Sequence, residues 1–201
     1  WLEMTGIAMG QAGAAYNTVE VISSGLASIE FTVRTGGGQN GGADGFAFTI
    51  VEVASSDQLL NLLNAASTGG GLGYGVGGAY QDPDFTLNGD AITVEIDTWR
   101  NVDNGTTQRH TDPTEQNHIA ITQNADPGDH VAWFPVPNIE DLQPHTIRLD
   151  LLDGSMRISF DGELVIEQDI TFAFKGGYMF FSGSTGWATN YHRVDDLRIL
   201  H

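Results

Sequence analysis

The sequence predicts an all-β fold, and three features support that prediction. Apolar residues recur at every second position in short runs, as in strands that place one face on a core. The 26 glycines are scattered between these runs, and few segments have helical spacing. Asn88-Gly89, Asp153-Gly154 and Asp161-Gly162 stand between runs, and such pairs tolerate the positive φ angles of tight turns. We therefore expect many short antiparallel strands.

The individual elements follow in chain order. The alternation begins over 29–33 and predicts further strands over 46–50, 92–97, 118–122, 145–152, 156–160, 164–169, 177–182 and 194–200. One helix is expected over 56–64, where leucines follow the capping residues Ser55, Ser56 and Asp57, although this segment could equally be an apolar loop plug. The glycine-rich stretches 36–45 and 69–78 are too short for linkers, and we interpret both as shaped loops.

The composition limits what the chain can bind. Eight basic and 26 acidic residues give a formal net charge of −18, which repels nucleic acid and anionic membranes and attracts cations. No cysteine is present, so any metal must be held by oxygen and imidazole ligands. No apolar run approaches the roughly 20 residues needed to cross a bilayer, so membrane insertion is not expected. The length of 201 residues suits a single domain over 1–201.

Candidate metal ligands cluster near the middle of the chain. Strand alternation over 92–97 places Glu95 and Asp97 on one face, about 7 Å apart along the backbone. The same logic turns His118 away from the core, so it can join the carboxylates if the two strands are adjacent. The loop between them is long and polar enough to wrap a hard cation; it carries Asn101, Asp103, Asn104, Asp112, Glu115 and Asn117. Alternatively, Glu95 and Asp97 simply face solvent on an amphipathic strand.

These residues resemble a known family. The segment 94–101 (Val-Glu-Ile-Asp-Thr-Trp-Arg-Asn), followed by Asp112-Pro113 and by 118–121 (His-Ile-Ala-Ile), is similar to the metal-binding segment of the legume-type (L-type) lectins. Three further segments, 42–48, 69–73 and 181–186, resemble sugar-binding loops of that family in the same order. The resemblance runs from about residue 2 to residue 200 and is specific because all four segments agree in order and spacing.

The resemblance implies a concanavalin A-like jelly-roll β-sandwich of two antiparallel sheets, in a bacterial member of the family or an adhesin domain. The first residues, Trp1 to Thr5, are similar to the family's second segment. The chain is therefore expected to lack the family's first strand and to be excised from a larger protein.

The resemblance also implies two metal sites. The calcium ligands would be Asp97, Asn101, Asp112 and the backbone carbonyl of Trp99. A second site, for Mn²⁺ or another transition metal, would be formed by Glu95, Asp97, Asp112 and His118. The loop from 101 to 112 is longer than in plant members, so Asp103 and Asn104 remain open as alternatives to Asn101.

A sugar pocket is implied beside the metals, with a cis peptide before Asp44. Polar contacts and an aromatic surface would come from Asp44, Gly70, Gly71, Trp99, Asn101, Thr185, Gly186 and Trp187. Alternatively, the Trp99 side chain packs in the core and does not contact the sugar. The remaining histidines His110, His130, His145 and His192 show no partner pattern, and surface or hydrogen-bonded structural roles are expected for them.

We therefore predict a calcium-dependent lectin domain that binds glycans or glycoconjugates outside the cell or on its surface, for adhesion or glycan recognition, and is not an enzyme. One alternative is a peptide- or protein-binding module of an extracellular adhesin, with a cell-surface protein as partner. A glycoside hydrolase of the same fold is less favoured. Glu95-Ile96-Asp97 resembles the start of the Glu-x-Asp-x-x-Glu strand of laminarinase-type enzymes, but Trp99 and Arg100 follow where the second glutamate would be needed.

Overall fold

The structure, a computed structural model, describes residues 1–19, 26–76, 87, 90–106, 110–170 and 177–200. It is built from strands β1 (Leu2–Thr5), β2 (Ala12–Tyr16), β3 (Ala27–Gln39), β4 (Gly45–Val51), β5 (Ala91–Asp97), β6 (His118–Gln123), β7 (His130–Pro135), β8 (His145–Leu152), β9 (Ser155–Phe160), β10 (Glu163–Asp169), β11 (Tyr178–Ser184) and β12 (Thr189–Leu200). The helix α1 (Ser56–Ala65) and a 3-10 turn, η1 (Gly69–Gly71), stand between β4 and β5.

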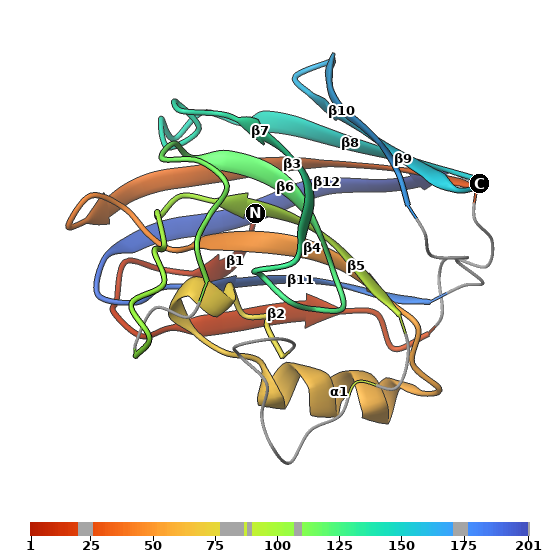
Figure 1. The fold of residues 1–201 in the computed structure, drawn as a ribbon, viewed down its shortest axis with the longest axis horizontal. Helices are drawn as coiled ribbons and strands as arrows, with labels where there is room; N and C mark the ends of the chain where they lie inside the picture. Colours follow the sequence, from red (N-terminus) through yellow and green to blue (C-terminus); the bar gives the residue numbers. More distant parts are fainter. Residues whose placement is uncertain (20–25, 77–86, 88–89, 107–109, 171–176, 201) are drawn as a thin grey trace.

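The strands form two antiparallel six-stranded sheets, which confirms the predicted fold class. One sheet has the order β1-β12-β3-β8-β9-β10 and the other β2-β11-β4-β5-β6-β7. Figure 1 shows the sheets as two stacked layers, with α1 outside the second sheet. Hairpins join β8 to β9 and β9 to β10 as predicted, with positive φ angles at Gly154, Asp161 and Gly162. The predicted turn at Asn88-Gly89 lies outside the described residues.

The main core lies between the sheets and follows the predicted alternation. Ile92, Val94 and Ile96 of β5 are buried in it. Three phenylalanine rings meet at its centre, with centroids 4.9 to 5.4 Å apart, from Phe31, Phe48 and Phe181. The other face of the second sheet therefore remains available for polar groups and loops.

A second apolar cluster covers part of that other face. Leu59 and Leu62 of α1 pack there with Leu72, Tyr74 and Phe180. The helix begins as predicted, because the Ser55 side chain accepts a hydrogen bond from the backbone N–H of Gln58. The prediction of a helix is confirmed, and the alternative of an irregular plug is wrong. Within the described ranges, no helix is long and apolar enough to span a membrane.

The prediction that 36–45 is a loop is wrong in its first half. Residues 36–39 belong to β3, and the loop itself begins only after Gln39. The glycines are required because β3 lies close to neighbouring backbone: a Cβ on Gly38 would be 1.4 Å from the carbonyl oxygen of Thr189. In the second stretch, Gly69–Gly71 forms a tight helical turn, and residues 77 and 78 lie outside the described residues.

Candidate metal and ligand site

The predicted metal-binding strands are adjacent. β5 pairs with β6, and Asp97 lies opposite His118 in the register. Glu95 is 1%, Asp97 2% and His118 1% exposed, on the face of the sheet opposite the main core. The alternative that Glu95 and Asp97 face solvent is therefore wrong. Buried carboxylates need compensation, since burying an uncompensated charge is costly.

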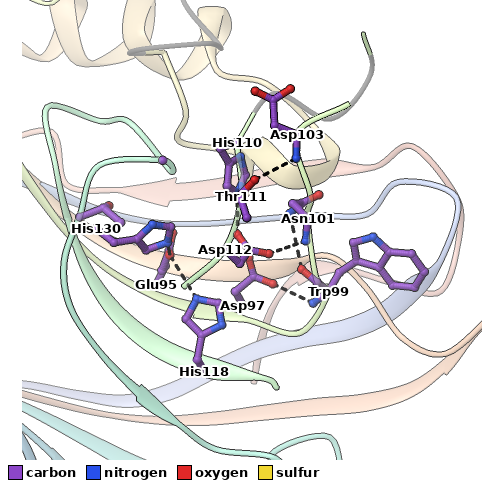
Figure 2. A network of polar contacts seen from close by, with 12 residues as sticks. Glu95, Asp97, Trp99, Asn101, Asp103, His110, Thr111, Asp112, His118 and His130 are labelled. Carbon is purple, nitrogen blue, oxygen red and sulfur yellow. Dashed lines mark hydrogen bonds and ion pairs between the residues drawn. The ribbon is translucent and has the colours of Figure 1, made fainter. Parts of the chain in front are cut away.

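The first group of candidate ligands comprises Asp97, His110 and Asp112, whose donor atoms lie within 4.8 Å of one another. Nε2 of His110 lies 2.8 Å from Oδ1 of Asp112, yet this oxygen has no partner with hydrogen-bond geometry. Oδ1 of Asp97 accepts a hydrogen bond of 2.7 Å from the Trp99 backbone N–H. These contacts are drawn in Figure 2. The unused Oδ1 atom of Asp112 is a suitable ligand for an oxygen-binding cation.

Asn101 is the loop residue that joins this group. Its backbone N–H donates to Oδ2 of Asp112, its side chain is fully buried, and its Oδ1 atom has no hydrogen-bond partner. The alternatives Asp103 and Asn104 are exposed, and their side-chain oxygens accept hydrogen bonds from Gly105 and Thr106. Between the three candidates, the structure therefore favours Asn101 as the residue that faces the carboxylates.

The second group comprises Glu95, His118 and His130. Oε1 of Glu95 lies 2.9 Å from Nε2 of His130 and 3.8 Å from Nε2 of His118. Oε2 of Glu95 accepts a hydrogen bond of 2.6 Å from the hydroxyl of the buried Tyr74. The set Glu95, Asp97, Asp112 and His118 implied by the resemblance is thus divided, with a different histidine added to each part.

The pKa values of the carboxyl groups of Asp97 and Glu95 are strongly shifted. Burial, followed by repulsion from Asp112 and Glu95, raises the pKa of Asp97 well above its usual range. Burial alone would also raise the pKa of Glu95, but its contacts with His118 and His130 lower it to about 2. Among the described residues, the ion pairs of these carboxylates involve only histidines. A bound cation would relieve the repulsion.

Asp44 lies beside this cluster, at the meeting point of three loops. The Ala43–Asp44 peptide is cis, as the resemblance implied. The Asp44 backbone N–H donates to the carbonyl of Ser184, and the Ser184 hydroxyl donates to the carbonyl of Gly69. A Cβ on Gly186 would lie 2.9 Å from Oδ2 of Asp44. The segments 43–45, 69–71 and 184–186 therefore converge.

The Asp44 side chain is held with one acceptor unused. Oδ2 is buried without a hydrogen-bond partner. Burial, opposed by a backbone hydrogen bond from Gly186 and assisted by the charge of Asp112, raises the pKa of Asp44 to about 7. A carboxylate prepared in this way can accept hydrogen bonds from hydroxyl groups, and a cation nearby would keep it ionised.

The other predicted sugar-binding residues differ in their exposure. Trp187 is 67% exposed, and Trp99 is half-buried with its ring near Gly41, so core packing of Trp99 is not observed. Figure 2 shows the Trp99 ring pointing away from the carboxylates. Gly70 is half-buried, whereas Gly71 is buried.

Thr185 does not fit its predicted role as a sugar contact. It is completely buried. Its hydroxyl donates to the carbonyl of Ala8 and accepts from the Gln11 backbone N–H, so both functions of the hydroxyl are occupied by the N-terminal segment. Thr185 therefore ties the loop to the N-terminal segment, while its neighbour Gly186 lies beside Asp44 and Trp187 is exposed.

Three residues that contact the cluster were not predicted. His110 and His130 pair with candidate metal ligands, and Tyr74 holds Glu95. The spacing of His110 two residues before Asp112 is a local signal that could have identified it. No comparable signal exists for His130, because β7 itself is not evident in the sequence pattern.

No family model and no curated protein matches this chain. Solved structures match over nearly the whole chain. The VIP36 exoplasmic/lumenal domain in its Ca²⁺/Man-bound form is 13% identical, with a TM-score of 0.69, and the match covers 98% of this chain and 76% of that one.

Two plant lectins match similarly. Basic winged bean lectin with Tn-antigen is 15% identical, with a TM-score of 0.72 and coverage of 98% of this chain and 84% of that one. Lectin II from Ulex europaeus is also 15% identical, with a TM-score of 0.72 and coverage of 98% and 85%. The fold that the sequence resemblance implied is confirmed: the chain has the concanavalin A-like β-sandwich fold of the L-type lectins.

Proposed function

We propose that the chain is a calcium-dependent carbohydrate-binding domain that acts outside the cell. The observation that carries this proposal is the Asp44 carboxylate, which is buried, has an unused acceptor oxygen and is held at the junction of three loops beside a cluster of cation ligands. Such an arrangement suits hydroxyl donors of a sugar ring, because the acceptor is desolvated and fixed before the ligand arrives.

Calcium fits the first group of ligands. Ca²⁺ takes about six to eight oxygens from carboxylates, amide carbonyls, backbone and water. Asp97, Asp112 and Oδ1 of Asn101 would supply side-chain oxygens, and the carbonyl of Trp99 a backbone oxygen, as the resemblance implies. The unused oxygens of Asn101 and Asp112 support this assignment. The ion would fix the 97–101 segment, whose Thr98 donates two hydrogen bonds to the carbonyl of Asp44.

The sugar would lie between Asp44 and the exposed aromatic surface. Oδ2 of Asp44, the backbone of Gly70 and Gly186, and the Asn101 amide are the proposed polar contacts. Trp187 would stack on the apolar face of a pyranose, because an indole that is 67% exposed has area available for a ligand. The solved structures of similar fold include complexes with mannose-containing sugars, GalNAc and Tn-antigen, which supports a glycan as the ligand class.

Hydrolysis is less well supported. Glu95 is 1% exposed, and both of its oxygens are occupied, by Tyr74 and His130. A catalytic carboxylate of a glycosidase must reach the scissile bond together with a second carboxyl group about 5 to 10 Å away. Glu95 is therefore better suited to hold a neighbouring group than to attack a substrate.

The experiment is a glycan array probed with calcium and again after chelation. We expect retention of one saccharide class that is lost on chelation and in Asp44→Asn, while the exposed control Asp103→Asn binds normally. Binding that persists in Asp44→Asn would contradict the proposed contact. Absence of binding in both conditions would favour the protein-binding adhesin instead.

Calcium binding has its own readout in the thermal unfolding of the same proteins. An ion that binds only the native state stabilises it by about 2.7 kcal/mol at 100 times its Kd. The melting temperature should rise with calcium, and this rise should disappear in Asp112→Asn.

A further inference from the structure

Glu140, in the segment between β7 and β8, is a half-buried carboxylate held by two side-chain amides. Its Oε1 atom accepts a hydrogen bond from Nδ2 of Asn190, which is 1% exposed. Its Oε2 atom accepts a hydrogen bond of 2.6 Å from Nδ2 of Asn117. Two amide donors require two acceptor oxygens, and an ionised carboxylate supplies both.

The two amides belong to segments that are far apart in the sequence. Asn190 lies at the start of β12, four residues after Gly186, which is next to the Asp44 carboxylate. Asn117 immediately precedes β6. One Glu140 side chain therefore connects the β12 side of the proposed glycan site to the start of β6.

A third segment, the turn that leads to Asp44, packs directly on this carboxylate. A Cβ on Gly42 would lie 1.9 Å from Oε1 of Glu140 and 2.7 Å from Nδ2 of Asn190. Gly42 has a φ angle of 84°, and its N–H donates to the carbonyl of Gln39. Since Asp44 follows only two residues later, a displacement of Glu140 would reach the proposed sugar contact through the backbone.

The backbone around Glu140 is itself fixed to β3. A Cβ on Gly36 would lie 2.4 Å from the carbonyl oxygen of Glu140, and Asp141 forms a β-bridge with Gly36. The Leu142 N–H donates to the carbonyl of Thr35. The carboxylate is thus carried by a segment attached to the sheet, which suits a group that holds a binding loop in place.

We propose that Glu140 is a positioning residue of the glycan site, whose carboxylate holds the 40–44 turn, β12 and the segment before β6 in the arrangement that binds the sugar. It acts through Gly42 and Asn190 and is not itself a sugar contact. The inference rests on the proposed function, because it adds a residue to that same site. When the binding arrangement is populated only in part, the apparent affinity falls by that fraction.

The first test is Glu140→Gln, which keeps the shape of the side chain but replaces one acceptor oxygen with an NH₂ group. That group would face an amide donor, so one of the two hydrogen bonds is lost. Calorimetry with the saccharide that wild type retains most strongly on the array should show affinity about tenfold weaker, with an unaltered circular dichroism spectrum. Glu163→Gln, the same change at an exposed position, should bind normally. Normal affinity in Glu140→Gln would refute the proposal.

A second substitution should restore the lost hydrogen bond. In the double variant Glu140→Gln with Asn117→Asp, the glutamine amide donates to the new carboxylate at position 117, and its oxygen still accepts from Asn190. Affinity should return to within about threefold of wild type. Asn117→Asp alone places two carboxylates against each other and should weaken binding. A double variant that binds no better than the single variants would contradict the pairing.

Hydrogen exchange tests the positioning role without a glycan. The amides of Gly42 and Asp44 donate to the carbonyls of Gln39 and Ser184, and their exchange should be about tenfold faster in Glu140→Gln and slow again in the double variant. If wild type retains no glycan, the proposed function fails, and unchanged exchange at these two amides would separately refute the role of Glu140.

Two further results separate positioning from other effects. The rise of the melting temperature with calcium should persist in Glu140→Gln; its loss would mean that Glu140 acts on the metal ligands, against the proposal. If Glu140→Gln does not fold, Asn117→Ala takes its place, since it removes only one of the two amides. It should weaken glycan binding by about threefold and speed exchange at Gly42, and wild-type behaviour in both measurements would overturn the inference.

Discussion

One contribution to acid destabilisation of the fold should come from a buried histidine, His192 of β12. Its side chain is completely buried, Nδ1 lies 2.7 Å from the Thr5 hydroxyl, and Nε2 has no hydrogen-bond partner. Burial lowers the pKa of His192 from 6.5 to about 3. Between these two values the unfolded chain binds a proton that the folded chain does not.

The sign and size follow from this difference. The contribution of neutral His192 to the free energy of unfolding is fully present above pH 6.5 and is lost as the pH falls toward 3. Each pH unit in this window costs about 1.4 kcal/mol, so the loss at pH 5 is about 2 kcal/mol. That loss is a large part of the stability of an ordinary domain, which is roughly 5 to 15 kcal/mol.

The assay is urea unfolding followed by circular dichroism at several pH values between 5 and 7.5, on wild type and His192→Gln. Glutamine does not titrate, so the advantage of wild type over the variant should shrink by about 2 kcal/mol from pH 7.5 to pH 5. Comparing the two proteins in the same buffer cancels the titration of all other groups that both share. A difference that stays constant across this range would refute the reasoning.

Three further changes test the packing of the loops, the sheet and the helix. Gly186→Ala places a methyl group 2.9 Å from Oδ2 of Asp44. It should weaken glycan binding on the array by more than about tenfold, or about 1.4 kcal/mol, while the circular dichroism spectrum stays unaltered. Normal binding would show that Asp44 tolerates the contact. Gly38→Ala forces a Cβ against the Thr189 carbonyl. It should lower the free energy of unfolding by about 3 kcal/mol in urea titrations. A loss below about 1 kcal/mol would mean that β12 can move aside. Ser55→Ala removes the side-chain cap of α1 and should cost about 1 kcal/mol in the same titrations, with Ser55→Thr close to wild type.

Strand periodicity explains which site residues could be predicted. A residue two positions along a strand faces the same side, so Glu95 and Asp97 were placed together on the polar face, and the pairing of β5 with β6 brought His118 beside them. Placing Glu95 and Asp97 on one face needed only the local pattern, whereas the adjacency of β5 and β6 was a condition that the structure meets. His130 could not be reached in the same way because it lies on β7, whose half-exposed residues show no clear alternation.

The strands that the pattern does not predict lie at sheet edges. β1, β2 and β7 are all terminal strands in their sheets, and the residues of β2 and β7 are largely exposed or half-buried. An edge strand loses the periodic burial on which sequence prediction depends. The interpretation of 36–38 as a loop is wrong for a related reason: the backbone that requires glycine comes from distant segments, Glu140 for Gly36 and Thr189 of β12 for Gly38.

The placement of tryptophan has a practical consequence for spectroscopy. The chain has four tryptophans, and none lies in the apolar core: Trp1, Trp133 and Trp187 are 50%, 44% and 67% exposed, and Trp99 is half-buried. The native fluorescence emission spectrum should already be close to that of solvent-exposed tryptophan, so unfolding should change its maximum little. A ligand that covers Trp187 would shift that emission to shorter wavelength. Intrinsic fluorescence, usually a monitor of folding, would in this protein report occupancy of the binding face.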